Sequence, residues 1–448
     1  MPKVDPFHAI QYNGGTGDVS TKVAPPYDVL DSASKSALLD RDADNIVAID
    51  LPHVPAKELG PPETYERAAK TLDDHLQNGV LGVSAQPAMF AYRQTFDFEG
   101  ITHQRCGMVA TLETQPFGPR EGGGVLPHEE TFSGPKEDRF ALMKETRAQL
   151  SPIFGLHADE KGEATNIVRS SMEGRDPDQT ARTDDGVLHE VWTITDETII
   201  NEYRRALDGE DVFIADGHHR YTTAVNYLRH LTQMRELPDD HPARRTMFVL
   251  IGMSDPGLAI GPTHRVLGGM ASYDLDGFVA KLGDTFNVAE TQEPAEQSEH
   301  AMTAAGEPTS PGVLGLIDFA SGRRFVLTLK TPDPLEPQFP KMPIEWRQLD
   351  VTLVQHLIVK GVAEPAFNGG EPVKWAFPHT VKEVLEIGSG AETGAGGGAG
   401  FAQIGVIVRP TPLEAVRAIS RANELMPQKS TFFYPKLATG LFFKSLDV

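Results

Sequence analysis

Apolar residues along the chain fall into two kinds of pattern, short β-rich runs and stripes at helical spacing, which together predict a mixed α/β fold. Residues 88–98 and 101–112 are rich in β-branched and aromatic side chains around Glu99-Gly100, as expected of a hairpin. A helical stripe follows Pro61-Pro62 and ends at Asn78-Gly79. Its apolar face consists of Tyr65, Ala68, Ala69, Leu72 and Leu76.

The same patterns predict further elements on both sides of the chain's centre. Strands are expected at 45–51, 191–194 and 246–251, and a second hairpin at 312–319 and 323–330. Helices are expected at 197–207, from Ser133 to about 150, at the start of 273–288, and after a capping Asp350. Residues 158–186 are polar without an apolar period and predict a surface excursion, whereas 291–311 and 388–400 have the composition of loops or linkers.

The most informative stretch is Val212 to Ala224, where an apolar run ends in Asp216-Gly217 and a helical stripe begins at once. This order predicts a strand, a tight turn and a helix whose first turn carries His218, His219 and Arg220. A helix N-terminus presents N–H groups and the positive end of its dipole to anions. Gly217 allows close approach of a ligand, and Arg220 can grip a phosphate.

Asp216 has three possible roles in this motif, as a helix cap, a Mg²⁺ ligand or a proton acceptor. A simpler interpretation is that Asp216-Gly217 is only a turn and the histidines are solvated surface. The density of polar residues directly at the end of a buried strand favours the functional interpretation, since ligands of α/β sheets collect at such positions.

A second dense polar stretch, 128–139, precedes and enters the helix expected after Ser133. Its charged residues are either capping and solvating groups or a second wall of the site. In the latter case Glu129 or Glu130 serves as a base or metal ligand, and Lys136 and Arg139 hold phosphate.

Two other stretches carry candidate cations. His264 and Arg265 follow a buried strand, although such a pair is often structural. Near the end of the chain, 426–437 combines aromatics, prolines and lysines, which predicts either a docked strand or a segment whose Lys429 or Lys436 reaches a pocket.

Composition limits the class of protein. A chain of 448 residues predicts two or three domains, here 1–115, 116–290 and 312–448, the last docking back on the core. The net charge of −22 argues against a nucleic-acid or membrane partner but permits a small basic pocket. The single cysteine excludes an internal disulfide and a cysteine-based zinc cluster. Residues 1–11 lack the apolar core of a signal peptide, so a cytoplasmic protein is expected.

Several motifs in one order resemble the family catalogued as domain of unknown function 1015. They are Pro25-Pro26-Tyr27-Asp28-Val29, His128-Glu129-Glu130-Thr131, Pro135 to Arg139, Ser151-Pro152-Ile153-Phe154, Asp216 to Tyr221, Pro262-Thr263-His264-Arg265 and Lys429 to Leu437. The resemblance spans nearly the whole chain, and 388–400 looks like an insertion.

Asp216 to Arg220 is also similar to the motif of free-serine kinases built on the ParB/sulfiredoxin fold. The resemblance implies a ParB/sulfiredoxin-like core with additional α+β elements, ATP or ADP with Mg²⁺ as cofactor, and phosphate binding by the turn and helix start, with Gly217 and Arg220. Tyr221, the next residue, is a further phosphate-binding candidate. The resemblance also implies that Asp216, with His218 and His219, assists transfer to a hydroxyl. The catalytic glutamate of those kinases lies on a separate segment, and Glu129 is our candidate for its role.

Three functions remain open at this point. The first is a nucleotide-dependent kinase of a small hydroxylated metabolite, with serine first, whose Mg²⁺ stays with the nucleotide. The second is a phosphatase or other hydrolase with a metal held by residues such as His128, His218, His219 and His264. The third is a nucleotide-binding regulator without turnover. No Gly-Lys-Ser or Gly-Lys-Thr phosphate loop is present, which excludes P-loop kinases.

Overall fold

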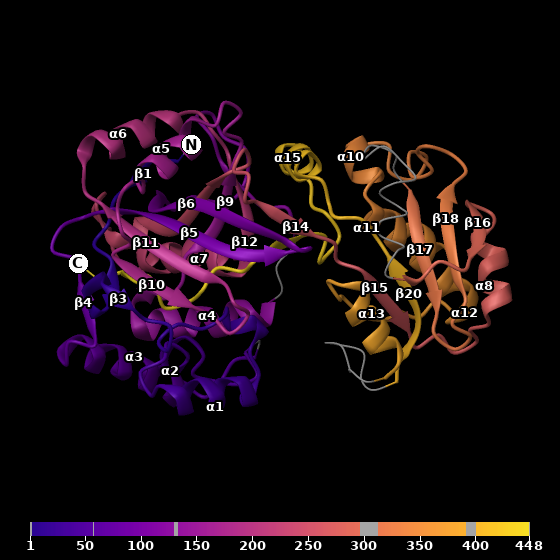
Figure 1. The fold of residues 1–448 in the computed structure, drawn as a ribbon, viewed down its shortest axis with the longest axis horizontal. Helices are drawn as coiled ribbons and strands as arrows, with labels where there is room; N and C mark the ends of the chain where they lie inside the picture. Colours follow the sequence, from indigo (N-terminus) through magenta and orange to yellow (C-terminus); the bar gives the residue numbers. More distant parts are fainter. Residues whose placement is uncertain (1, 57, 130–132, 296–311, 391–399, 448) are drawn as a thin grey trace. The chain divides into compact units, whose positions relative to one another are not determined.

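The computed structural model describes residues 2–56, 58–129, 133–295, 312–390 and 400–447 (Figure 1). By its internal contacts the chain divides into two compact units. The first contains 1–127, 131–259 and 433–448, and the second contains 128–130 and 260–432. The short strands β14 (Ala259–Gly261) and β21 (Phe432–Tyr434) occur where the chain passes between the units. The three regions expected from composition remain a prediction about domain boundaries.

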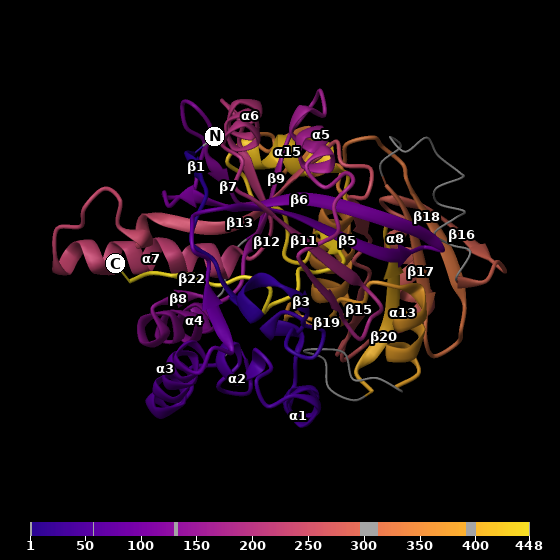
Figure 2. The same cartoon turned by 60° about the vertical axis from the view of Figure 1, so that its left-hand side comes forward.

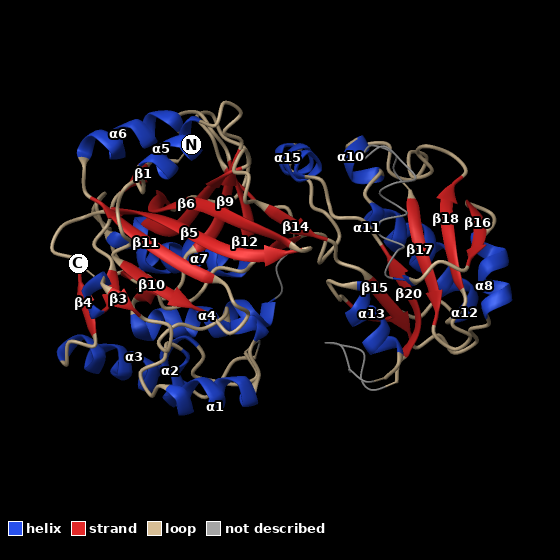
Figure 3. Cartoon of the chain, in the orientation of Figure 1, coloured by secondary structure: helices blue, strands red, loops and turns tan. Residues whose placement is uncertain are grey.

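A mixed sheet forms the centre of the first unit, in the order β3-β10-β11-β5-β6-β13-β9-β12-β7, with β1 beside β6 (Figure 3). The pairs β13–β9 and β12–β7 are parallel, whereas β5, β6, β11 and β13 pair antiparallel. The strands are β1 (Val4–Asp5), β3 (Gly17–Asp18), β5 (Met89–Phe98), β6 (Ile101–Glu113), β7 (Val125–Leu126), β9 (Ile153–His157), β10 (Gln179–Arg182), β11 (Leu188–Ile194), β12 (Val212–Asp216) and β13 (Arg245–Gly252).

Helices cover both faces of this sheet. Figure 2 shows α5 (Glu163–Ser170) and α6 (Glu197–Ala206) on one side, and α7 (His218–Met234), α4 (Ser133–Thr146) and α3 (Pro62–Gln77) in succession on the other. The smaller elements are α1 (Ser32–Arg41), α2 (Val47–Asp50), the 3₁₀ turns Asn13–Gly15, Tyr27–Val29 and Pro242–Arg244, and the strands β2 (Ile10–Tyr12) and β4 (Leu81–Val83). Successive residues are buried at 89–92 of β5 and at 105–112 of β6, as expected of strands whose two faces are both covered.

The end of the chain packs on the first unit. Strand β22 (Lys444–Ser445) pairs antiparallel with β8 (Ala148–Gln149), and Phe443 and Thr439 form bridges to Ile10 and Ala24. The docking of the whole region 312–448 on the core stays a prediction.

The second unit is built on an antiparallel sheet in the order β16-β18-β17-β20-β15-β19. Successive residues of its strands enter opposite cores, as Val266 and Leu267 or Ile317 and Leu316 do. Its strands are β15 (Arg265–Gly268), β16 (Phe286–Thr291), β17 (Val313–Asp318), β18 (Arg324–Leu329), β19 (Lys374–Ala376) and β20 (Ala402–Ile407). Its helices are α8 (Leu275–Leu282), α10 (Ile344–Arg347), α11 (Asp350–Leu353), the π-helix η4 (Val354–Ala363), α12 (Glu364–Phe367), α13 (Val381–Gly388) and α15 (Leu413–Arg421).

The mixed α/β class, both hairpins, the strand–turn–helix motif and the helices at α3 and α6 are confirmed. The strands expected at 191–194 and 246–251 correspond to β11 and β13, and 273–288 forms α8 followed by the start of β16. The loop predictions at 291–311 and 388–400 lie mostly outside the described residues. None of the described helices is long and apolar enough to cross a membrane.

Four local predictions are wrong for identifiable reasons. Residues 45–51 contain helix α2 rather than a strand, because the Asn45 side chain accepts the N–H of Val47 and fixes a helical turn. The polar stretch 158–186 contains α5 and β10, and the Asp159 carboxylate accepts the first N–H groups of α5. Helix α4 ends at Thr146, before β8. Asp350 does not cap α11, since its carboxylate is bound by Arg409 at 2.7 and 2.9 Å.

Candidate functional site

The turn between β12 and α7 combines a buried strand end with a helix start. Strand β12 ends at Asp216, Gly217 follows with a φ of 99°, and α7 begins at His218. This left-handed φ favours glycine, and a Cβ at position 217 would lie 3.1 Å from the guanidinium carbon of Arg220. No side chain at the cap position uses the N–H groups of the first turn. The turn therefore places the first backbone N–H groups of α7 directly after the end of β12.

Asp216 is held between two cations and does not act as the helix cap considered above. Its Oδ1 lies 2.6 Å from Lys436 Nζ, and its Oδ2 lies 2.5 Å from Arg220 Nη2. Burial acts to raise the pKa of Asp216, but the charges of Lys436 and Arg220 outweigh burial and hold it well below its usual range. Asp216 is thus a stably ionised carboxylate, which makes it a weak proton acceptor.

Arg220 connects the motif with the loop before β9. Its guanidinium donates to the carbonyl of Pro152 and lies 3.4 Å from the Ser151 hydroxyl, in addition to its ion pair with Asp216. Its side chain is 13% exposed, so the cation is largely withdrawn from solvent yet still reaches the surface. Three acceptors orient the guanidinium plane beside the first turn of α7.

A second buried arginine lies close to this one. Arg139 of α4 donates to the Asp50 carbonyl at 2.6 Å and to the Asp138 carboxylate at 2.7 Å, and its guanidinium lies 4.0 Å from the ring centroid of Tyr27. Burial raises the pKa of Asp50 despite the opposing charges of Arg139 and Arg220. Both arginines therefore act on one buried carboxyl group.

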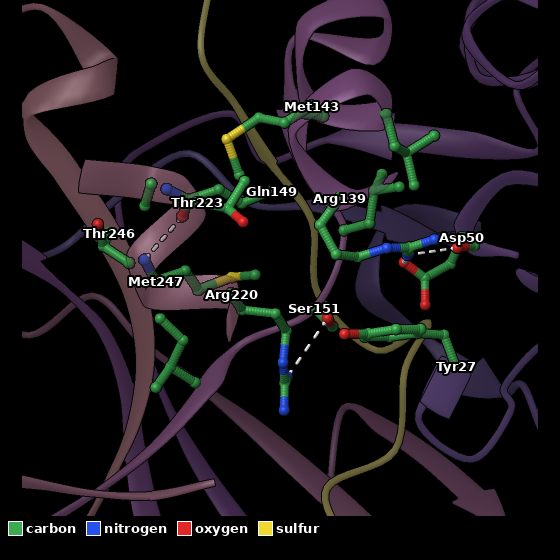
Figure 4. Close-up of a pocket in the computed structure, with 15 residues that line it drawn as sticks. Tyr27, Asp50, Arg139, Met143, Gln149, Ser151, Arg220, Thr223, Thr246 and Met247 are labelled. Atoms are coloured by element: carbon green, nitrogen blue, oxygen red, sulfur yellow. Dashed lines mark hydrogen bonds and ion pairs between the residues drawn. The ribbon is translucent and has the colours of Figure 1, made fainter. Parts of the chain in front are cut away.

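Arg139, Arg220, Asp50, Tyr27 and Ser151 line one cavity of about 40 Å³ (Figure 4). Its remaining walls are mostly apolar side chains of α4, of the segment 148–153, of α7 and of β13. Ligand pockets for whole drug-sized molecules occupy on the order of 300–1,000 Å³, so this cavity suits only a small polar group. A larger ligand would place one end here and the rest outside.

The other predicted residues of the first unit are placed as follows. His218 is buried and its charge acts on Asp216, whereas His219 is half-buried on the first turn of α7. Tyr221 is fully buried against Phe117 and Phe248, with its hydroxyl donating to the Gln115 carbonyl. That position is a core position, so we do not retain Tyr221 as a phosphate ligand.

Lys136 is half-buried near the start of α4 and is not among the described residues that line the cavity. Its assignment as a phosphate ligand stays a prediction.

Four predicted residues belong to the second unit, where they form a cluster of their own. The Glu129 carboxylate accepts the Lys429 N–H at 2.8 Å, and Arg265 donates to the carbonyls of Thr263 and Lys429 at 2.6 and 3.0 Å. His264 is fully buried and accepts the Val408 N–H at 3.2 Å. Residues from three separate parts of the sequence, at 129, 264–265 and 429, therefore lie together in the second unit. That they share a site with Asp216 stays a prediction.

Asp50 and Ser151 were missed, and Lys436 was named only as an alternative to Lys429. Asp50 ends a run that was interpreted as a strand, which hid its carboxylate. Ser151 and Lys436 each lie in a motif of the family resemblance, which was the available signal for both, whereas no motif marks Asp50. Among the described residues no group of three or more His, Cys, Asp and Glu side chains is arranged to hold a metal ion.

Residues 4–352 match the family model described as "Protein of unknown function (DUF1015)". No curated protein matches the chain. Solved structures that are similar include a free serine kinase in complex with AMP, at 13% identity and a TM-score of 0.31, covering 73% of this chain and 94% of that one. A conserved hypothetical protein from Pyrococcus furiosus has 13% identity and a TM-score of 0.31, with 73% and 98% covered.

C-terminally truncated SbnI from Staphylococcus aureus has 9% identity and a TM-score of 0.31, covering 71% of this chain and 82% of that one. At these scores the structural likeness carries no argument about the activity of this chain.

Proposed function

The chain belongs to the DUF1015 family, whose name states no activity, and we propose from its site that it is a nucleotide-dependent phosphotransferase acting on a small hydroxylated metabolite, with serine as the first substrate to test. The observation that carries the proposal is the pair of cations, Arg220 and Lys436, held by Asp216 beside the N-terminus of α7. Phosphoryl transfer depends on positioning and on neutralising phosphate charge, and these groups supply both.

Asp216 acts in this proposal as a positioning residue. Because its pKa is held low, it remains charged and fixes the guanidinium of Arg220 and the ammonium of Lys436 in place. The phosphates would then be bound by the first-turn N–H groups of α7 and by these two cations. Mg²⁺ would arrive with the nucleotide and neutralise its phosphates; the Asp216 oxygens suit it chemically but already bind two cations.

The substrate hydroxyl needs a group that accepts its proton. Of the two carboxyl groups on which the charge of Arg220 acts, Asp50 has a raised pKa and Asp216 a lowered one, so Asp50 is the stronger proton acceptor. Asp50 also lines the cavity, which is large enough for a hydroxymethyl group. We therefore assign proton acceptance to Asp50, and His219 is the alternative that the sequence motif supplies.

The experiment incubates the full chain with Mg²⁺, ATP or ADP, and serine, and measures phosphoserine by mass spectrometry. Wild type and a Lys161→Ala control, which changes an exposed lysine before α5, should form product at equal rates. Arg220→Ala and Asp50→Asn should lower the rate at least tenfold.

Absence of transfer to serine and to a panel of other hydroxylated metabolites would refute the proposal. Hydrolysis of phosphoserine in its place would establish the phosphatase alternative, and nucleotide binding without either reaction would establish the regulator.

A further inference from the structure

A second and larger cavity, of about 780 Å³, lies within the second unit. Residues from β15, α10, η4, β19 and the segment 425–428 line it. Its volume falls within the range of about 300–1,000 Å³ that is usual for small-molecule sites. Arg265, a candidate from the sequence, lines it, but none of the residues given a role in the proposed phosphotransferase does.

Two aromatic rings that stack on one another contribute to the lining of this cavity. Trp375 and Phe377 are two residues apart at β19, and their rings are parallel within 6° at a centroid distance of 5.8 Å. Both side chains are half-buried, so part of each ring faces the cavity side. The Arg265 guanidinium lies over the Phe377 ring, 4.9 Å from its centroid, so Trp375 and Arg265 both pack on Phe377 and the indole of Trp375 is the ring available to a ligand. Such a surface is suited to stacking a flat heteroaromatic ring.

The charge of the lining is the opposite of that of the chain. Lys360, Lys374 and Arg265 contribute to it, and none of the described residues that line it is acidic. In a chain of net charge −22 this local excess of cations favours an anionic ligand. The carboxylate that acts on Arg265 is Glu129, which lies outside the lining.

The backbone that carries part of this lining is unusual. Gln355, His356 and Lys360 belong to η4, a π-helix of ten residues, whereas π-helical segments mostly occur as single turns and often at functional sites. Because the π register joins residues five apart, Gln355 and Lys360 follow one another on the same side of the helix. An amide and an ammonium are thereby presented together to the cavity.

We propose that this cavity binds a planar heteroaromatic ring that carries an anionic group, of the size of a nucleoside monophosphate. The ring stacks on Trp375, and Lys360 and Lys374 bind the anion. This is a separate ligand site from the motif at α7 and does not depend on the proposed phosphotransferase activity.

The test follows tryptophan fluorescence of the full chain during titration with AMP, GMP, CMP and UMP. Trp346 and Trp375 line the cavity, whereas Trp192 is buried in the first unit, so binding should quench the emission. The measurement is made in the Arg220→Ala background, which weakens binding at the α7 motif. Adenosine, which lacks the charge, and inorganic phosphate, which lacks the ring, should bind at least tenfold more weakly than AMP.

Lys360→Ala/Lys374→Ala should weaken nucleotide binding at least tenfold, and both lysines are exposed, so the variant should fold. The matched control is Lys382→Ala, an exposed lysine of α13 that does not line the cavity. Absence of quenching by all four nucleotides, or quenching that the double variant leaves unchanged, would overturn the proposal. Tighter binding of a single-stranded oligonucleotide than of any mononucleotide would also overturn it, in favour of a nucleic-acid partner.

Discussion

The ion pair between Asp216 and Lys436 should fasten the C-terminal segment to the motif, and a double-mutant cycle measures how strongly. The contact is 2.6 Å long, and its side chains are 20% and 30% exposed. Hydrogen bonds to charged groups contribute about 1.5–3 kcal/mol when well buried, whereas exposed ion pairs contribute about 0–1 kcal/mol. Partial exposure and the remaining partner Arg220 place the expected coupling at about 1–2 kcal/mol.

The assay measures the free energy of unfolding of the first unit in urea for wild type, Asp216→Asn, Lys436→Met and the double variant. Trp192 is the tryptophan of the first unit, so the cycle is built in a background where Trp346 and Trp375 are phenylalanine. Its fluorescence then reports that unit separately from the second.

The coupling should also depend on pH in a defined direction. Because the pKa of Asp216 is lowered in the folded state, its stabilisation is present above the unfolded value of about 3.9 and is lost as pH falls through the folded value. The coupling free energy between Asp216 and Lys436 should therefore be equal at pH 7 and pH 5, because both pH values lie above the unfolded pKa. A matched cycle on the pair Arg147–Asp447, whose side chains are 62% and 58% exposed, should give less than about 0.5 kcal/mol. A coupling for Asp216–Lys436 no larger than that of this control would refute the reasoning.

Further predictions concern the same unit. Asp216→Asn should lower turnover much more than nucleotide affinity, since both cations remain to attract the phosphates but lose the charge that orients them; the rates and the binding titration check this. Arg220→Ala should weaken nucleotide binding by about 1.5–3 kcal/mol in a calorimetric titration. Gly217→Ala should destabilise the unit by about 1–2 kcal/mol in urea, because a φ of 99° is unfavourable for alanine. Burial lowers the pKa of Lys444 to about 7, so stability should rise between pH 7 and pH 10, and Lys444→Met should abolish that rise.

Much of the first unit could be predicted from the sequence because its helices and strands have strong local patterns of apolar residues. The hairpin of β5 and β6 has a long β-rich pattern and a Glu99-Gly100 turn, and β12 to α7 changes from a continuous apolar run to helical spacing within two residues. These patterns are local, so they survive without knowledge of the tertiary structure.

The elements and site residues that could not be predicted depend on contacts between side chains and backbone or between residues far apart in the sequence. Asn45 and Asp159 turn weak patterns into helices by accepting backbone N–H groups, which periodicity does not detect. Asp50 joins the site through Arg139, 89 positions away, and Lys436 reaches Asp216 from 220 positions away. Residue types identified the candidates, but only the fold determines which of them meet.

The measurement that tests the central claim most directly is a crystal structure of the full chain with ADP and Mg²⁺. Phosphate oxygens should lie within hydrogen-bonding distance of the first-turn N–H groups of α7. Arg220 should be a side-chain ligand of the phosphates, and Asp50 should face the end of the phosphate chain. An ordered nucleotide whose phosphates lie elsewhere, with the first turn of α7 and Arg220 making no contact to it, would contradict the account.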